Sequence, residues 1–320
     1  MIIHPELRAL RDDDSPQRMA QDATVARVMA WRDQPHVAAL LAAVGQFAGG
    51  GDLADHPELA RLFDENDAAD RLARELTGVT ACALADNWLG HAPFRHFTDD
   101  TISTLQLARS GYVTLSLVAI DGAGLAKRPP AAIADFSPSE VWERVLAGNA
   151  SAVVVDRGAT RPDSADLSTS TLSLSPGSLI VRDARSRHMR LEQVEGCLVS
   201  LRLQRRLPHA GPTREYALAD GALVHQAAGT PQDSRTELMM ALLGRMGRTD
   251  AAPAMAAIAR EEGSQALRWQ ALRECLSLDT AAGFSALSEV ARRSDDELAP
   301  AAGALRSQLI EAYPQLKEIA

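Results

Sequence analysis

Hydrophobic and polar positions change their period twice along the chain, near residue 100 and again near residue 230. Before the first change, apolar residues recur at the i, i+3, i+4, i+7 spacing that places side chains on one helix face. One such set is Val37, Leu40, Leu41 and Val44. The pattern predicts a helical N-terminal region over residues 1–100.

Residues 101–215 have a shorter period. Runs rich in Val, Leu and Thr are separated by Gly, Pro, Asp and Ser, and in TSTLSLS the residues Leu172 and Leu174 alternate with polar ones. Many short strands at close spacing favour an antiparallel sandwich or barrel over alternating strands and helices. We predict a β-sandwich over residues 101–215, followed by a linker over residues 216–232.

Helical spacing returns over residues 233–320. Ser234 and Glu237 have capping-box spacing, and an apolar stripe follows at Met239, Leu242, Leu243 and Met246. MAAIAR at 255–260 is echoed 32 residues later by LSEVAR at 287–292. Repeating helix pairs of about this length resemble HEAT-like repeats. The chain is thus expected to be an α+β multidomain protein, with a central antiparallel sandwich between N-terminal helices and a C-terminal helical domain.

Charge and composition narrow the classes of partner. The net charge is −9, from 33 basic and 42 acidic residues, whereas nucleic-acid binding draws on a dense positive surface. The three cysteines lie far apart and form no CxxC pair, which argues against a zinc ribbon or a disulfide framework. We expect no nucleic-acid partner.

The chain shows neither a secretory signal pattern nor 18 consecutive apolar residues. A cytoplasmic protein of bacterial type, without a membrane partner, is therefore expected.

Two stretches resemble the cupin motifs. SEVWERVLAGNASAVVVD (139–156) is similar to the first motif, with its glutamate, its strand and its turn glycine. SPGSLIVRDARSRHMRL (175–191) is similar to the second, in which Pro176 and Gly177 form a turn and His188 opens the next strand. This resemblance implies a small jelly roll over residues 101–205.

The sequence departs from metal-binding cupins, which place a His-x-His pair shortly before the glutamate of the first motif. The equivalent stretch, PPAAIADFSPSE, has no histidine, and Glu140 lies one residue too far from Gly148. Only His188 matches the usual set of three histidines and a glutamate, and one imidazole does not hold a catalytic metal tightly. The chain resembles more closely the metal-free sensor cupins of arabinose-type regulators.

Four residues are candidates for a ligand pocket. Strand alternation places His188 and Arg190 on one face and Met189 on the other. If the methionine face is the core, His188 and Arg190 point to solvent or a partner; if the sandwich encloses a polar cavity, they line it.

Trp142 and Arg144 share a face of the first motif's strand. Such a pair recognises a planar anion through stacking and bidentate hydrogen bonds. It serves equally as a core tryptophan whose arginine neighbour extends to water. Both interpretations stay open at this point.

His91 and His96 lie in GHAPFRHFTDD, just before the first predicted strand. Folded over the mouth of the sandwich, this segment could bring a histidine and an aspartate near His188. The alternative is that Phe94 and Phe97 dock the segment onto the sheet.

The sequence favours a non-enzymatic protein that senses a ligand or binds a protein, with no catalytic residue and no cofactor. A protein partner is expected on the C-terminal helices, a small-molecule ligand in the cupin, and a homodimer through the sheets is a further option. The alternative is a metal-dependent oxygenase or isomerase that uses His188 with His91 or His96, a carboxylate and Fe, Mn or Zn.

Overall fold

The computed structural model describes residues 10–65, 67–207 and 211–318. The chain divides into two compact units. The first contains the described residues up to Ala131 together with 139–158 and 167–206. The second contains 132–138, 159–166 and the described residues from Leu207 onward.

The first unit begins with helices, as the spacing of apolar residues predicts. They are α2 (Ser15–Arg32), α3 (Pro35–Phe47), the short 3₁₀ helix η1 (Leu53–Asp55), α4 (Pro57–Asp64) and α5 (Ala68–Asp86). A proline stands in the first turn of α2, α3 and α4, where the missing N–H leaves no hydrogen bond unmade. Val37, Leu40 and Val44 are buried on one face of α3, which confirms the helical prediction.

The main sheet of the protein is antiparallel and follows these helices. Its strands are β1 (Arg95–Thr98), β2 (Ile102–Ser110), β3 (Val113–Asp121), β5 (Ser139–Thr160), β6 (Ala165–Leu174), β7 (Leu179–Asp183) and β8 (Arg187–Arg206). The strand order is β1-β2-β3-β8-β5-β6, and β7 pairs with β5. A short helix, α6 (Gly122–Ala126), follows β3.

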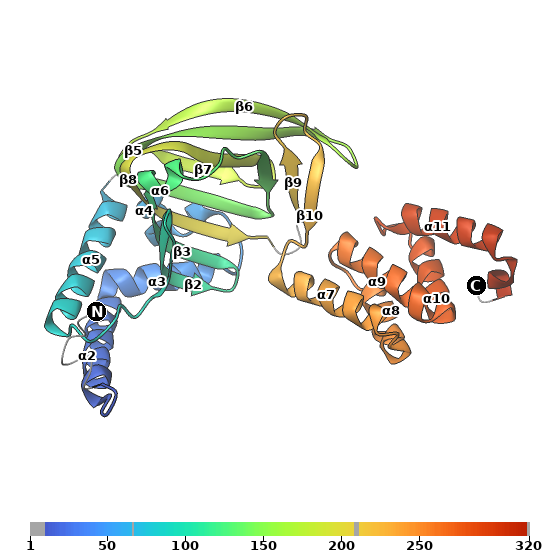
Figure 1. The fold of residues 1–320 in the computed structure, drawn as a ribbon, viewed down its shortest axis with the longest axis horizontal. Helices are drawn as coiled ribbons and strands as arrows, with labels where there is room; N and C mark the ends of the chain where they lie inside the picture. The colour runs from blue at the N-terminus through green and yellow to red at the C-terminus, as the bar shows by residue number, and fades with distance from the viewer. Residues whose placement is uncertain (1–9, 66, 208–210, 319–320) are drawn as a thin grey trace. The chain divides into compact units, whose positions relative to one another are not determined.

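One face of this sheet packs against the N-terminal helices (Figure 1), with α3 in contact with β2 and β3. The shared core contains Leu115, Leu201 and Leu203 from the strands and Phe47 from α3, all fully buried. Trp142 of β5 joins this core through an edge-on contact with Phe47, with 5.6 Å between ring centroids. The helices therefore cover the face of β5 that carries Trp142.

The second unit contains a three-stranded antiparallel sheet and the C-terminal helices. The sheet order is β10-β9-β4, formed by β4 (Ile133–Phe136), β9 (Thr213–Ala217) and β10 (Leu223–Ala227). The edge-on contact of Phe136 and Tyr216 stabilises its centre. Strand β10 lies within residues 216–232, where the sequence pattern indicates a linker.

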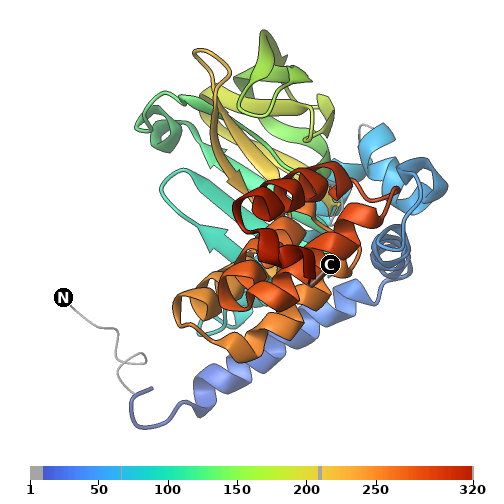
Figure 2. The same ribbon diagram turned by 90° about the vertical axis from the view of Figure 1, so that its right-hand side faces the viewer.

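The C-terminal helices pack pairwise (Figure 2): α8 on α9, α9 on α10, and α10 on α11. Their bounds are α7 (Pro231–Arg245), η2 (Thr249–Ala251), α8 (Ala252–Arg260), α9 (Gln265–Leu278), α10 (Thr280–Arg292), α11 (Ala299–Ala312) and η3 (Pro314–Glu318). Their core contains Leu272, Phe284 and Leu287. The two echoed segments fall in α8 and α10. Their identity as HEAT-like repeats stays a prediction.

The start of α7 differs from the expected capping box. Thr230 caps the helix, and its hydroxyl accepts a hydrogen bond from the Asp233 amide. Because Pro231 suits the first helical position, the helix begins there and Ser234 lies inside it.

The α+β class, with an antiparallel sheet between two helical parts, is confirmed. None of the described helices has the length and apolar character of a membrane span.

Candidate functional site

A cavity of about 530 Å³ lies within the first unit. Its walls come from β2, β3, β5, β6, β7, β8, α6 and the loop that follows α6. On β5 the lining residues are Glu143 and Val145, which alternate with Trp142 and therefore point to the opposite face. The cavity thus lies on the side of the sheet away from the N-terminal helices.

Much of the wall is apolar. Val145, Leu174, Ile180 and Leu198 line the cavity and belong to one buried cluster. Met189 and Leu191 also line the cavity and pack against this cluster. A hollow of this size with mostly apolar walls and a few polar groups is typical of small-molecule sites.

Glu143 is the buried charge of the cavity, with only 3% of its surface exposed. It lies directly opposite Arg202 in the β5–β8 pairing, and Ser200 lies two residues along β8 on the same face. Ser200 Oγ donates a 2.6 Å hydrogen bond to Glu143 Oε1. Arg202 donates two more, each 3.0 Å long, from Nε and from one terminal nitrogen.

These contacts decide the charge of Glu143. Burial by itself would raise the pKa of the carboxyl, because the charged form loses water. The opposite charge of Arg202 outweighs burial, together with the hydrogen bonds from Arg202 and Ser200 and a smaller contribution from Arg182. The pKa of Glu143 is therefore lowered, and the side chain is ionised at neutral pH.

Three further arginines line the cavity. Arg128 donates hydrogen bonds to the Thr101 hydroxyl at 2.9 Å and to Asp99 at 3.0 Å. Arg190 donates to the Ala131 carbonyl at 3.1 Å and to Glu192 at 3.2 Å. Arg182 projects from β7 near enough to Glu143 to lower its pKa.

The sequence candidates are distributed over both faces of the sheet. Arg190 lines the cavity, whereas Trp142 packs against Phe47 on the helix-covered face. Arg144 shares that face of β5; it is buried and donates a 2.9 Å hydrogen bond to the Gly177 carbonyl. His188 is half-buried opposite Val155 in the β5–β8 pairing and is not among the described residues of the cavity wall.

The residues of the metal-centre alternative are not gathered into one site. His91 and His96 are exposed, and the His96 ring lies 3.1 Å from the Phe94 carbonyl oxygen. Phe94 is buried and docks its segment, while Phe97 is exposed. In the described ranges of the chain, no three His, Cys, Asp or Glu side chains form a group that could hold a metal ion.

Glu143, Arg182, Ser200 and Arg202 were not singled out from the sequence. A signal exists for Glu143 and Arg182, because each is a charged residue in phase with apolar strand positions. Glu143 lies between Val141 and Val145 in a two-residue period. A charge on an otherwise apolar strand face is costly unless it is paired, so it marks an internal polar site.

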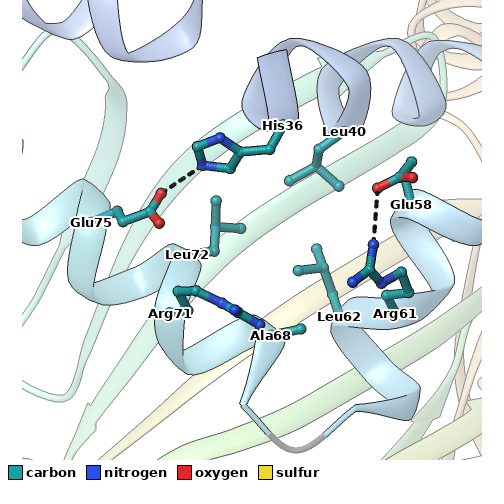
Figure 3. Close-up of a pocket in the computed structure, with 9 residues that line it drawn as sticks. All are labelled: His36, Leu40, Glu58, Arg61, Leu62, Ala68, Arg71, Leu72 and Glu75. Carbon is teal, nitrogen blue, oxygen red and sulfur yellow. Dashed lines mark hydrogen bonds and ion pairs between the residues drawn. The ribbon is translucent and has the colours of Figure 1, made fainter. Parts of the chain in front are cut away.

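A second hollow, of about 290 Å³, lies between α3, α4 and α5 (Figure 3). His36 Nε2 lies 2.8 Å from Glu75 Oε2 across this hollow, and Arg61 Nη1 lies 3.6 Å from Glu58 Oε2 along α4. All four side chains are at least one-third exposed. These are surface pairs over the core leucines of the helices, and exposed pairs of this kind contribute little.

A third hollow, of about 680 Å³, lies among the C-terminal helices. Trp269, Arg273, Leu309 and Tyr313 are among its lining residues. Of these three hollows in the described parts of the chain, only the cavity beside the main sheet contains a buried carboxylate held by hydrogen bonds. That cavity is the candidate site.

No family model matches the chain, and no curated protein matches it. Several solved structures resemble about a third of it. A cupin superfamily protein from Desulfitobacterium hafniense is 16% identical and covers 35% of this chain and 83% of its own, with a TM-score of 0.24. Ectoine synthase from P. lautus is 10% identical, covering 35% and 68%, with a TM-score of 0.24.

KdgF from Halomonas sp. is 15% identical and covers 35% of this chain and 89% of its own, with a TM-score of 0.23. Similarity at these scores carries no argument about activity, which depends on the residues of this chain itself.

Proposed function

We propose that the first unit is a degenerate, sensor-type cupin that binds a small molecule in its cavity and catalyses no reaction. The observation that carries this proposal is the wall of the cavity, in which apolar side chains surround a Glu143 carboxylate already bound by Arg202 and Ser200. Apolar walls supply affinity, and a few fixed polar groups supply orientation.

The state of Glu143 supports binding over catalysis. A general base needs a pKa near the working pH and an accessible lone pair, whereas the pKa of this carboxyl is lowered and three donors hold its oxygens. The described residues of the cavity wall include no histidine, cysteine or lysine. The wall is therefore suited to holding a ligand in a fixed orientation.

Ala126 provides the test, because it lines the cavity and is exposed, so it lies at the opening. Ala126→Trp is expected to block entry without disturbing the core. Ala123→Trp is the matched control, since Ala123 is exposed on the same short helix and is not among the described lining residues.

Each protein would be incubated with a small-molecule extract of its source cells, washed, and denatured to release bound compounds for mass spectrometry. A compound retained by the parent and by Ala123→Trp, but lost from Ala126→Trp, supports the proposal. Equal retention by all three proteins, or none by the parent, contradicts it.

We propose further that α7 is the contact surface for a protein partner. Leu238, Met239, Leu242 and Met246 are each more than half exposed, and their spacing places them on one side of α7. Arg235 and Arg245 are exposed on the same side of the helix. Arg235 lies three residues before Leu238, and Arg245 lies three residues after Leu242. An apolar face with two arginines fits an acidic amphipathic helix.

A fluorescein-labelled helical peptide tests this surface, with leucines on one face and glutamates elsewhere. We expect fluorescence anisotropy to show binding to the parent, and loss of binding with Arg235→Glu/Arg245→Glu. A lysine version of the peptide is the control. Equal binding of the two peptides would rule out an acidic partner.

A further inference from the structure

The charges around the cavity are unequal. Among the described lining residues, Arg128, Arg182, Arg190 and Arg202 face Glu143 and Glu192. Asp99, beside Arg128, adds a carboxylate from just outside the wall. The guanidinium groups therefore exceed the carboxylates by one. Arg128, Asp99 and Glu192 are exposed. Glu143, Arg190 and Arg202 are more deeply buried, and there charges interact more strongly than in water.

Arg190 shows where an acceptor is missing. Two of its guanidinium nitrogens donate to Ala131 and Glu192, but its Nε is buried and makes no hydrogen bond within the described parts of the chain. Buried donors are normally paired, because losing water without gaining a partner costs free energy. Because the neighbouring atoms close off this Nε, a ligand acceptor in the cavity would pair with the terminal nitrogens of Arg190, each of which carries a second N–H beside the one that donates to Ala131 or Glu192.

Two arginines connect the wall to the loop that follows α6. Arg190 donates to the carbonyl of Ala131, and Arg128 is held by Thr101 and Asp99. Both guanidinium groups are therefore held in place before a ligand arrives, which lowers the entropic cost of binding. Planar guanidinium groups bind carboxylates with particular strength and specificity.

We infer that the ligand is a small organic acid, a monoanion whose carboxylate lies against Arg190 and Arg182 and whose apolar body fills the space between Val145, Ile180 and Leu198. This inference depends on the proposed ligand-binding function and names the chemical class of the ligand. The single excess guanidinium group limits the ligand to one negative charge, because Arg202 already balances Glu143 and a second ligand carboxylate would have no cationic partner.

Two dyes that differ in charge test the inference. 8-Anilino-1-naphthalenesulfonate is a monoanion on an apolar aromatic body, and N-phenyl-1-naphthylamine has the same aromatic framework without the sulfonate. Both dyes are expected to bind the parent with an increase in fluorescence. Ala126→Trp is expected to weaken the binding of both dyes. Ala123→Trp is expected to weaken neither.

Arginine variants then separate charge from shape. Arg190→Gln and Arg182→Gln are each expected to raise the Kd of the anionic dye about tenfold, because each removes one charge-assisted hydrogen bond. The Kd of the neutral dye should stay within about twofold of the parent value. Arg187→Gln is the matched control on β8, because Arg187 is exposed and paired with Asp156. It should leave both dyes unchanged.

The outcomes distinguish the two proposals. If the neutral dye binds at the cavity and Arg190→Gln and Arg182→Gln leave the anionic dye unchanged, the cavity binds ligands but does not select an acid. If Ala126→Trp weakens neither dye, the cavity is not a binding site and both proposals fall. Unchanged affinity for the neutral dye in the arginine variants also shows that they are folded.

Discussion

Arg202 of β8 lies directly opposite Glu143 of β5, and its guanidinium group donates two hydrogen bonds of 3.0 Å to the carboxylate. This pair lies on the cavity side of the sheet, where burial by itself would raise the pKa of the carboxyl. The pair keeps Glu143 ionised and joins the neighbouring strands β5 and β8 through their side chains.

Removing one partner of this pair should destabilise the first unit. Glu143→Ala leaves Arg202 and Ser200 without their acceptor, and we expect the free energy of unfolding to fall by about 2–3 kcal/mol, because the remaining charge and donor are only partly rehydrated. Urea denaturation followed by circular dichroism measures the change.

Glu143→Leu/Arg202→Leu is the control for this prediction. The double variant should be more stable than the sum of the two single changes implies, because it leaves no unpaired charge. Strict additivity would show that the pair contributes no coupling energy.

Stability should also depend on pH through Glu143. Its pKa in the folded protein is lowered from the ordinary glutamate value of 4.5, so the unfolded chain binds the proton more readily than the folded one. The free energy of unfolding therefore holds this contribution above about pH 4.5 and loses it as the pH falls toward the folded pKa.

Urea titrations between about pH 3 and 7 test the sign of this dependence. Glu143→Gln, which cannot ionise, should have a flatter profile over the acidic range than the parent. An identical slope in the two proteins would contradict the assigned direction.

Trp142 should stabilise the fold without contributing to the cavity. It packs against Phe47 on the helix-covered face, and we expect Trp142→Ala to cost about 3 kcal/mol or more through the void it leaves. Trp142→Phe should cost less.

Dye binding is the second measurement on these variants. Both should keep the dye affinities of the parent, measured in the folded state at low temperature. If Trp142→Phe lost affinity for the anionic dye alone, Trp142 would contribute to ligand binding.

Metal content tests the enzyme alternative. Because His91, His96 and His188 form no ligand group with a carboxylate of the described chain, mass spectrometry of untagged protein purified without chelator should find far less than one metal ion per chain. His188→Ala should give the same result. One equivalent of Fe, Mn or Zn in the parent, lost in the variant, would support the metal-dependent alternative instead.

Periodicity determined the helical and strand-rich regions of the chain, although it indicated a linker where β10 forms. The helical spacing of Val37, Leu40 and Val44 and the alternation around Leu174 are local properties of the chain, and they correctly predicted the α+β class and the order of its parts. The departure of the first cupin-like stretch from the metal-binding pattern was also visible in the sequence, because it depends only on residue identity and spacing.

Only the tertiary structure decided which face of β5 meets the cavity. Alternation showed that Trp142 and Arg144 oppose Glu143 and Val145, but both faces carry apolar and charged residues. The choice depended on α3, which covers the Trp142 face through Phe47. Helix packing is a long-range contact with no local sequence signature, and for that reason the sequence alone did not assign the Trp142 face to the core and the Glu143 face to the cavity.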